Sequence, residues 1–352
     1  MSKKIIVHGC AGAGISISDK VYSFVESIDT SGKAEVFFNA IDTSDANFKD
    51  TKHLKDVIGL HKISNANLTN NILDGSGGIR AHSSTSIIKG TKEYLDKYKY
   101  LSPEKGTIHL IISSASGGSG NMIAVELLSN LMAKEIPVVL VLIGDSSTAK
   151  YAENTRKTLL TVNNISKANE RIVSIRYLLN NYSSYKTVQE AQMHNDGEIT
   201  MLLDLLSTFN GDVKDLDFQD LFNITNPKAK DFGIPTGVYS LISKVGDSEN
   251  EKLSNNLTPI ISRTIIQNFN EYVPLNIVQT KTGTIENAAL KENVQLLHSD
   301  NNLTLLLAAG GLQAEIDYLK NIEDEIFKSI SKVKDSLDIS SNETPDENGL
   351  VL

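Results

Sequence analysis

Three segments rich in glycine and serine each follow a predicted strand, and these residue types suit the binding of phosphate. Glycine lets backbone N–H groups approach an anion closely and adopts positive φ. Successive N–H groups at a helix start surround a phosphate, helped by the helix dipole. Three such loops indicate an extended polyphosphate. The candidate residues are Gly9, Cys10, Ala11, Gly12 and Gly14 in the first segment, Gly75, Gly77 and Gly78 in the second, and Ser116, Gly117, Gly118, Ser119, Gly120 and Asn121 in the third.

The spacing of glycines within these segments shows which known phosphate-binding motifs the sequence matches. A Walker P-loop, G-x-x-x-x-G-K-[ST], does not occur. The dinucleotide motif G-x-G-x-x-G is only half matched, because a pattern begun at Gly12 places Ile17 at the third glycine. A nicotinamide-dependent oxidoreductase stays as an alternative from another class. A tight strand–helix turn is the structural alternative for the first glycines, and Cys10 is expected to be a small packing residue rather than a reactive thiol.

Two acidic residues, Asp217 and Asp220, are the candidate catalytic groups. Their i, i+3 spacing at a predicted helix start points both carboxylates the same way, so that they can orient and polarise a water molecule. The helix dipole also favours acids at this position, which is the structural alternative. The role of Asp215, two residues earlier, stays open.

Strands and helices are predicted to alternate in the first half of the chain. Continuous apolar strands buried on both faces, with helices between them, indicate an α/β fold with a doubly wound parallel sheet. Ligands bind outside the carboxyl ends of strands in such a sheet, which is where the glycine-rich loops lie. The strands are expected at residues 4–7, 34–41, 57–63, 108–112, 138–143 and 172–179.

The second half is predicted to form a smaller α+β domain after a long central helix. That helix covers residues 198–209 and ends at Asn210-Gly211. Strands of a second sheet are expected at residues 238–242, 275–278 and 303–308, and a terminal helix begins at Gln313. The predicted parts are a nucleotide-binding domain (1–183), the central helix region (184–210), a second, activation domain (211–311), a C-terminal helix (312–336) and a disordered acidic tail (337–352).

The composition excludes several classes of protein. A chain of 352 residues suggests two domains, and its formal net charge of −9 argues against direct binding of nucleic acid. One cysteine excludes a disulfide framework and a thiolate metal cluster. The longest apolar run, residues 136–143, is far shorter than the ~20 residues that span a bilayer. The N-terminus does not read as a secretory signal, so we expect no membrane contact and a cytoplasmic location.

The segment Ser116–Met122 resembles the signature loop of the tubulin/FtsZ superfamily, G-G-G-[ST]-G-[ST]-G, which holds the phosphates of GTP. Its central Gly-Gly-Ser-Gly is intact, while Ser116, Asn121 and Met122 depart from the pattern. Like the family's loop, it lies between a buried strand and a helix. The other motifs follow in the family's order, and the resemblance covers residues 4–310.

The resemblance implies roles for several further residues. Residues 9–14 correspond to the family's first glycine loop, and Asp42 with Thr43 to the position that reaches the metal-bound phosphates. Residues 74–80 resemble the loop that senses the γ-phosphate. Asn180 and the pair Asn195-Asp196 match residues that read guanine, and Glu153 is expected near phosphate or ribose. Ala191 stands where the family has a stacking aromatic, so base stacking is expected from Tyr182 or Tyr185.

The segment from Gly211 to Asp220 is similar to the family's synergy loop, G-x-x-N-x-D-x-x-[DE], in which Asp217 and Asp220 match the two acids. In the family this loop contacts the nucleotide of the next subunit. The resemblance therefore implies a GTPase that uses GTP/GDP and Mg²⁺, the ion being carried by the phosphates without direct protein ligands. Head-to-tail assembly, in which each subunit completes its neighbour's site, generates an open filament.

A short chain with an acidic tail looks most like the TubZ-type partition GTPases of phages and plasmids. That resemblance implies transport of phage or plasmid DNA in the cytoplasm of a bacterial host. A basic DNA-binding adaptor, recruited through Asp338–Leu352, would hold the DNA. The alternatives are a filament for positioning, as in a phage spindle or a division ring, and a homologue that binds GTP without hydrolysing it. Asp42 as a helix cap and Asn180 and Asn195 as surface residues are the structural alternatives.

Overall fold

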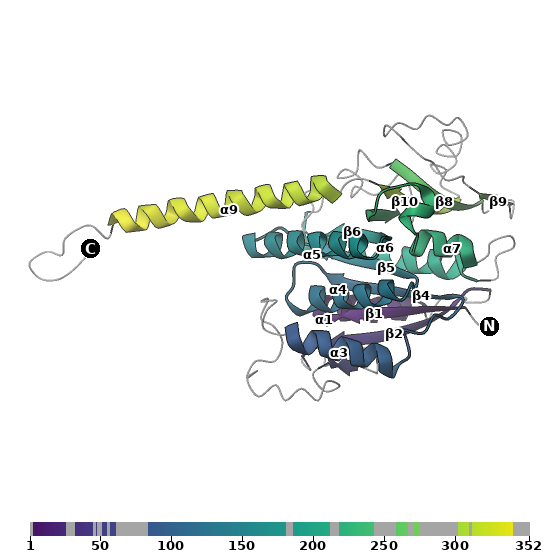
Figure 1. Ribbon diagram of the computed structural model, residues 1–352. Helices are drawn as coiled ribbons and strands as arrows, with labels where there is room; N and C mark the ends of the chain where they lie inside the picture. The colour runs from purple at the N-terminus through teal and green to yellow at the C-terminus, as the bar shows by residue number, and fades with distance from the viewer. Residues whose placement is uncertain are drawn as a thin grey trace, which may run out of the picture.

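The computed structural model describes residues 3–25, 32–44, 47, 51–54, 57–60, 84–180, 186–211, 218–242, 258–266, 271–274, 302–309 and 312–340. Within these ranges a single sheet of ten strands forms the centre of the molecule (Figure 1), in the order β3-β2-β1-β4-β5-β6-β7-β10-β8-β9. The strands from β3 to β7 run parallel to one another.

The parallel strands follow the apolar runs of the sequence. They are β1 (Lys4–Cys10), β2 (Glu35–Asp42), β3 (Val57–Gly59), β4 (Thr107–Ser114), β5 (Val138–Gly144), β6 (Ile172–Leu179) and β7 (Gly237–Ile242). Every residue of β5 is buried, and so is every residue of β4 except its last. Strands buried on both faces need cover on both faces, and this confirms the predicted α/β fold.

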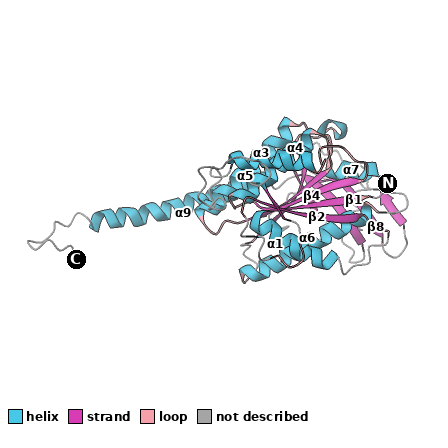
Figure 2. Ribbon diagram, turned by 90° about the horizontal axis from the view of Figure 1, so that it is seen from below, coloured by secondary structure: helices cyan, strands magenta, loops and turns pink. Residues whose placement is uncertain are grey.

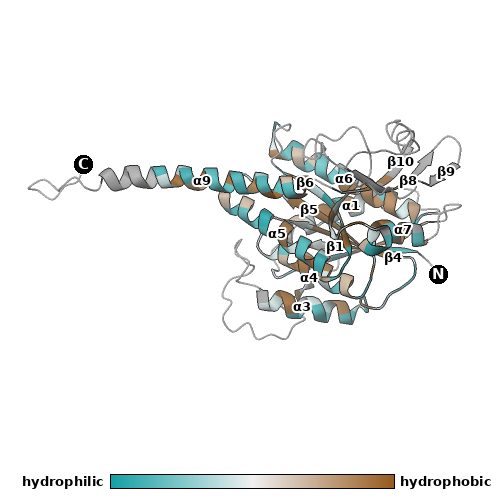
Figure 3. Cartoon of the chain, turned by 45° about the horizontal axis from the view of Figure 1, so that its top comes forward, coloured by the Kyte–Doolittle hydropathy of each residue, from teal (hydrophilic) through white to brown (hydrophobic). Residues whose placement is uncertain are grey.

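Helices cover the two faces of the sheet unequally (Figure 2). The helices α1 (Ala11–Val25) and α6 (Val188–Phe209) lie on one face. The helices α3 (Ser84–Lys97), α4 (Ser119–Ala133) and α5 (Ala149–Ala168) lie on the other. Hydrophobic residues concentrate on the central strands and on the inner faces of these helices (Figure 3). The result is two apolar cores, one on each side of the sheet.

The strands predicted as a second sheet continue the first one. β7 pairs in parallel with β6, starting at Gly237 opposite Ile172. β10 (Asn302–Ala309) pairs antiparallel with β7, and β8 (Thr258–Ile266) and β9 (Glu271–Pro274) follow at the edge. The strand predicted at residues 275–278 lies outside the described residues. The apolar pattern predicts a strand but not its partner, because pairing across a sheet is non-local, and the prediction of a separate sheet was wrong for this reason.

The helices beyond the central one are α7 (Phe218–Thr225), a short 3₁₀ helix (Ala229–Phe232) and α9 (Leu312–Ser340). The first part of α9 packs against α5, and the rest extends away from the body (Figure 1). The helix is four residues longer than the predicted 312–336, so Asp338 belongs to it rather than to the tail. No helix within the described residues is long and apolar enough to span a membrane.

Candidate functional site

Three loops meet at the carboxyl ends of the central strands. β1 lies between β2 and β4, with Cys10 in register with Ile41 on one side and Ser113 on the other. The chain leaves β1 into α1 on one face of the sheet, and leaves β4 into α4 on the opposite face. A reversal of this kind opens a crevice at the strand ends, which is where open α/β sheets bind ligands.

The turn from β1 into α1 is tight because two glycines allow it. A Cβ on Gly14 would stand 2.2 Å from the carbonyl oxygen of Ile112, and a Cβ on Gly9 would stand 2.6 Å from Ser18 Oγ. Both glycines are therefore required for packing of α1 against the sheet, which supports the structural alternative for these two positions. Ala11, between them, has a φ of 53°, a left-handed conformation that is strained for a residue with a side chain.

The start of α4 lies beside this turn. The helix begins after Gly118, and no side chain of the described residues forms a cap hydrogen bond there. A Cβ on Gly120 would stand 3.1 Å from the carbonyl oxygen of Cys10, which shows how closely the two loops approach. By contrast, a Cβ on Gly117 would meet one atom of the described residues, Ser114 Oγ, at 4.0 Å. Packing against the described residues therefore does not require glycine at position 117.

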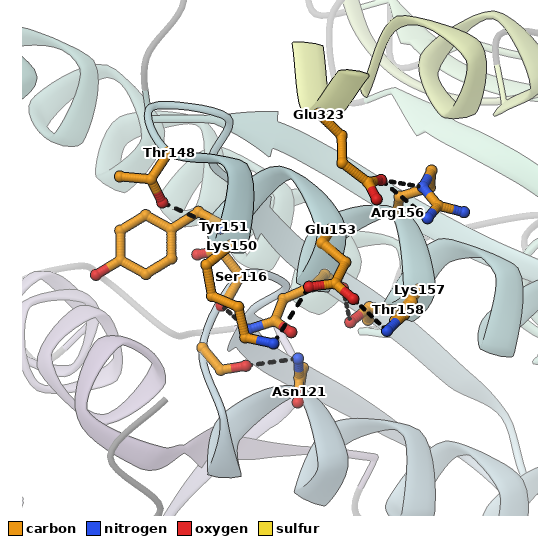
Figure 4. A network of polar contacts seen from close by, with 12 residues as sticks. Ser116, Asn121, Thr148, Lys150, Tyr151, Glu153, Arg156, Lys157, Thr158 and Glu323 are labelled. Atoms are coloured by element: carbon orange, nitrogen blue, oxygen red, sulfur yellow. Dashed lines mark hydrogen bonds and ion pairs between the residues drawn. The ribbon is translucent and has the colours of Figure 1, made fainter. Parts of the chain in front are cut away.

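Side chains behind this loop hold its backbone in place (Figure 4). Asn121, which is fully buried, donates from Nδ2 to the carbonyl oxygens of Gly117 at 2.7 Å and Ala115 at 3.0 Å. Asn154 Nδ2 donates to the Ser116 carbonyl oxygen at 2.9 Å, and Thr158 Oγ1 to that of Ala115 at 2.9 Å. Asn121 therefore has a structural function where the sequence departs from the tubulin/FtsZ pattern.

Asn154 and Thr158 were missed by the sequence analysis. Their i, i+4 spacing places two polar groups on one face of α5, and both are buried. A buried polar pair on a helix that follows β5 is the signal that could have found them.

The loop after β2 joins the same cluster. Thr43 Oγ1 donates to Ser119 Oγ at 3.0 Å, which links the end of β2 to the start of α4. Asp42 accepts from the Thr43 backbone N–H at 2.6 Å and from Asn47 Nδ2 at 2.6 Å. The structure thus brings both predicted residues to the glycine-rich loops, with Thr43 in direct contact and Asp42 bonded within its own loop.

Cys10 is buried at the end of β1. Burial, reinforced by the nearby Asp42 carboxylate, raises the pKa of its thiol far above the ordinary range. A thiol held protonated is a poor nucleophile. The environment of Cys10 therefore supports packing rather than reactivity.

A second group of polar side chains lies at the ends of β5 and β6. Asn195, which is 1% exposed, donates from Nδ2 to the Leu179 carbonyl oxygen at 3.2 Å and to Asn180 Oδ1 at 3.3 Å. Its own Oδ1 is buried without a hydrogen-bond partner among the described residues. Asp196 instead forms an ion pair with Lys20 of α1 at 2.7 Å. The structure brings Asn180 and Asn195 together and directs Asp196 toward α1.

The C-terminal end of α6 lies at the amino ends of strands β1 and β4. Asn210 Nδ2 donates to the Gly106 carbonyl oxygen, just before β4, at 2.8 Å. Lys3 Nζ donates to the Gly211 carbonyl oxygen. A Cβ on Gly211 would stand 2.0 Å from the carbonyl oxygen of Gly32. Lys3 precedes β1, whose last residue, Cys10, lies beside the glycine-rich loops. Gly211, where the predicted synergy loop begins, is therefore separated from those loops by about the length of β1, which is about 23 Å for seven residues.

Comparison with known proteins gives a fold-level result. No protein-family model matches the sequence, and no curated protein matches it. Among solved structures, the phage tubulin PhuZ with GDP aligns with a TM-score of 0.67 at 16% identity, over 99% of both chains. A protofilament of TubZ from bacteriophage PhiKZ aligns with a TM-score of 0.70 at 16% identity, over 94% of this chain and 93% of that one. An FtsZ mutant from M. jannaschii aligns at 0.55 and 14%, over 89% and 92%.

The chain has the tubulin/FtsZ fold. The resemblance that rested on the glycine-rich loops is thereby confirmed at the level of the fold. The tubulin-like fold also explains why the loops after β1, β2 and β4 converge, since their strands are neighbours in its sheet.

One predicted site residue of this tubulin-like chain, Glu153, forms ion pairs within its own helix (Figure 4). Glu153 forms ion pairs with Lys150 and Lys157 of its own helix, and the hydrogen bond from Lys157 lowers the pKa of its carboxyl group. The next residue, Asn154, is the one that reaches the loop at Ser116. A role for Glu153 at phosphate or ribose stays a prediction.

Several predicted residues fall outside the described part of the tubulin-like fold. Gly75, Gly77, Gly78, Tyr182, Tyr185, Asp215 and Asp217 lie in undescribed segments, and of Asp220 only its place in α7 is described. Their roles stay predictions. Among the described residues, no group of three His, Cys, Asp or Glu side chains could hold a metal ion.

Proposed function

We propose that this chain is a GTPase that assembles head to tail into filaments, in which each subunit completes the active site of its neighbour. The observation that supports the proposal is the separation of two segments along β1. The glycine-rich loops lie at the carboxyl end of β1, and Gly211, which leads into the predicted catalytic segment, lies at its amino end. The seven residues of β1 span about 23 Å, which keeps these groups apart in a lone molecule. The GDP in the phage tubulin PhuZ and the protofilament of TubZ support the nucleotide and the assembly.

The described residues fit GTP. The uncapped start of α4 and the loop at Gly117 suit the phosphates, which favour free N–H groups at a helix N-terminus. The unpartnered Oδ1 of Asn195 can accept a hydrogen bond from guanine N1–H or its exocyclic amine, whereas adenine offers no donor at N1. The hydroxyl groups of Thr43 and Ser119, which bond to each other, suit contact with the oxygens of metal-bound phosphates. Mg²⁺ would be carried by the phosphates without direct protein ligands and would neutralise their charge.

In this proposal Asp217 and Asp220 of the next subunit orient the water that attacks the γ-phosphate. The experiment that tests it measures phosphate release from GTP over a range of protein concentrations, together with negative-stain microscopy. We expect the rate to rise more steeply than linearly with concentration, and filaments to form with GTP. A rate strictly proportional to concentration, from molecules that stay monomeric, would contradict shared sites. A chain that assembles without releasing phosphate would be a binding homologue rather than an enzyme.

We further propose that the filament transports phage or plasmid DNA in the cytoplasm of a bacterial host. Two observations support an adaptor between filament and DNA. The chain has a formal net charge of −9, and residues 338–352 contain four acidic residues and no Lys or Arg. α9, which leads toward them, extends away from the body (Figure 1). A basic DNA-bound protein could reach the tail there. A filament that positions DNA in a spindle or ring would share the same chemistry and differ in its partner.

Removal of the tail tests this second proposal. A chain ending at Ser336, which removes Asp338–Leu352, should hydrolyse GTP at the wild-type rate, because every residue proposed for the active site precedes the tail in the sequence. Its affinity for the adaptor–DNA complex, measured in filament pelleting, should fall and lose its salt dependence. Unchanged affinity would show that the tail is a solubilising end.

A further inference from the structure

A cavity of about 520 Å³ opens near the amino ends of strands β1 and β4, at the opposite ends of these strands from the glycine-rich loops. Ile6 of β1, Phe37 and Asn39 of β2, and His109 of β4 contribute to its lining from the sheet. The turn after α3, at Tyr98–Tyr100, and the segment 102–104 contribute from above. Sites for small molecules have volumes of about 300–1,000 Å³, so this cavity is large enough to hold one.

The cavity is separate from the nucleotide site. Lys4, the first residue of β1, lines it, whereas Cys10, the last residue of that strand, lies beside the phosphate-binding loops. Seven residues of strand span about 23 Å. A molecule in the cavity would therefore not touch GTP in the same subunit.

A chain of buried polar groups ends at this cavity. Tyr94 Oη bonds to His8 Nδ1 at 2.8 Å, and His8 Nε2 bonds to His109 Nδ1 at 2.8 Å. Burial lowers the pKa of His8 well below its ordinary range and that of His109 to about 3, so both rings are neutral at physiological pH. A neutral imidazole has one donor and one acceptor nitrogen. His109 Nε2 is therefore a donor or an acceptor. Which of the two it is depends on which ring nitrogens of His8 and His109 carry the protons.

A second polar group in the lining has no partner among the residues that the structure describes. Thr107 is 4% exposed, and its Oγ1 is buried without a hydrogen bond to any of them. Asn39 donates from Nδ2 to Tyr100 Oη at 3.0 Å, which leaves its Oδ1 for another donor. Buried polar groups are normally satisfied, so an unsatisfied hydroxyl in the wall of a cavity points to a bound molecule.

The remaining surface of the cavity is aromatic and carries little unpaired charge. Phe37 is 46% exposed and Tyr98 is 39% exposed, large fractions for aromatic side chains in a folded protein. Lys4 is paired with Glu104 at 3.0 Å, and Lys99 is exposed. A flat aromatic group can stack on Phe37. The ring of Tyr98 is already stacked with that of Tyr100 and has Lys97 Nζ 5.4 Å from its centroid, so it offers its edge. The geometry thus combines exposed rings with neutral hydrogen-bonding groups at the base.

From this arrangement we propose that the cavity binds a small, uncharged, planar aromatic molecule, which contacts Phe37 and Tyr98 and hydrogen-bonds to His109 and Thr107. An uncharged occupant fits because the hydrogen-bonding groups of His109 and Thr107 are neutral and the ammonium of Lys4 is already paired, while the ammonium of Lys99, which also lines the cavity, belongs to an exposed side chain. The site goes beyond the proposed GTPase activity and does not depend on it.

The probe for this proposal is indole, a neutral planar molecule with one N–H donor. The full chain, labelled with ¹⁵N-histidine and without nucleotide, is titrated with indole while the ring nitrogens of His109 are followed by NMR. The ring protons of Tyr100, 5.3 Å away between centroids, serve to assign them. We expect a saturable shift of the His109 signals, and Phe37→Ser should weaken binding about tenfold through the lost stacking.

Two controls make the test decisive. Val188→Ser, at a 60% exposed position of α6 outside the cavity, should bind indole like the wild type. Benzoate, which is similar in shape but charged, should bind more weakly than indole. His109 signals that do not move up to the solubility limit of indole would overturn the proposal, and so would equal affinity in the Phe37→Ser variant. Benzoate binding as tightly as indole would overturn the uncharged occupant.

Discussion

Glycines at neighbouring positions of one motif serve different purposes in this protein. Gly14 and Gly9 allow α1 to lie directly on β4 and on its own turn, whereas Gly117 has open space around it. A sequence motif records the residue type alone, so it cannot separate a glycine needed for packing from one that lets a ligand approach. Distances to a hypothetical Cβ separate the two.

A pair of substitutions tests this distinction. Gly14→Ala would bring a Cβ within 2.2 Å of a backbone oxygen that cannot move freely, so we expect a loss of about 2–3 kcal/mol in the free energy of unfolding. Gly117→Ala should change that free energy by less than about 0.5 kcal/mol, yet weaken binding of GTP. Urea unfolding and nucleotide titration of both variants check the prediction. Equal urea midpoints for the two variants would contradict it.

Among the elements, the positions of strands were predictable and their partners were not. Apolar runs predicted all six strands from β1 to β6, most clearly β4 and β5, which are buried on both faces and show no alternation. The partner of β7 was missed, because pairing Gly237 with Ile172 joins residues far apart in the chain. The contact of Asn154 with Ser116 was missed for the same reason. In the candidate site, local motifs predicted the loops, while the side chains that hold them came from the structure.

α9 is attached to the body by two polar contacts as well as apolar packing. Tyr177 Oη donates to Glu315 Oε1 at 2.7 Å, and Arg156 bonds to Glu323 at 2.9 Å. Glu315 is 4% exposed, and burial raises the pKa of its carboxyl group above the ordinary 4.5, although the bond from Tyr177 opposes this. The folded chain therefore binds this proton more tightly than the unfolded chain, so ionisation of Glu315 destabilises the folded state.

The pH dependence of unfolding tests the role of Glu315. In the wild type, its contribution to stability is greatest below pH 4.5 and falls as pH rises through the raised pKa. Glu315→Gln cannot ionise, so the difference in unfolding free energy between the two proteins should shift in favour of the variant from pH 4 toward pH 8. Chemical unfolding across that range measures the difference, with Glu153→Gln on the exposed side of α5 as a control that should show no such rise. A difference that stays constant with pH would contradict a buried, destabilised carboxylate.

At the scale of the whole molecule, the two chemical ends face opposite edges of one continuous sheet. The glycine-rich loops proposed to bind phosphate lie at the carboxyl ends of the strands, and α6 carries the chain to their amino ends, where Gly211 is held by Lys3. In the proposed assembly these two ends are the head and the tail of the subunit. Contacts between a head and the next tail would repeat without closing, which would produce a filament rather than a ring of fixed size.

The most direct test of this account mixes two inactive variants. Asp217→Ala keeps the phosphate-binding loops but lacks the proposed catalytic carboxylate, and Gly120→Val blocks the loops, because its side chain would meet the Cys10 carbonyl oxygen, but keeps Asp217. Phosphate release from GTP is measured for each variant alone and for the mixture, with circular dichroism to verify that both are folded. The account predicts hydrolysis in the mixture well above the sum of the separate rates, because the intact Asp217 of one variant completes the intact loops of the other. Two folded variants whose mixture hydrolyses GTP no faster than their sum would contradict the shared site.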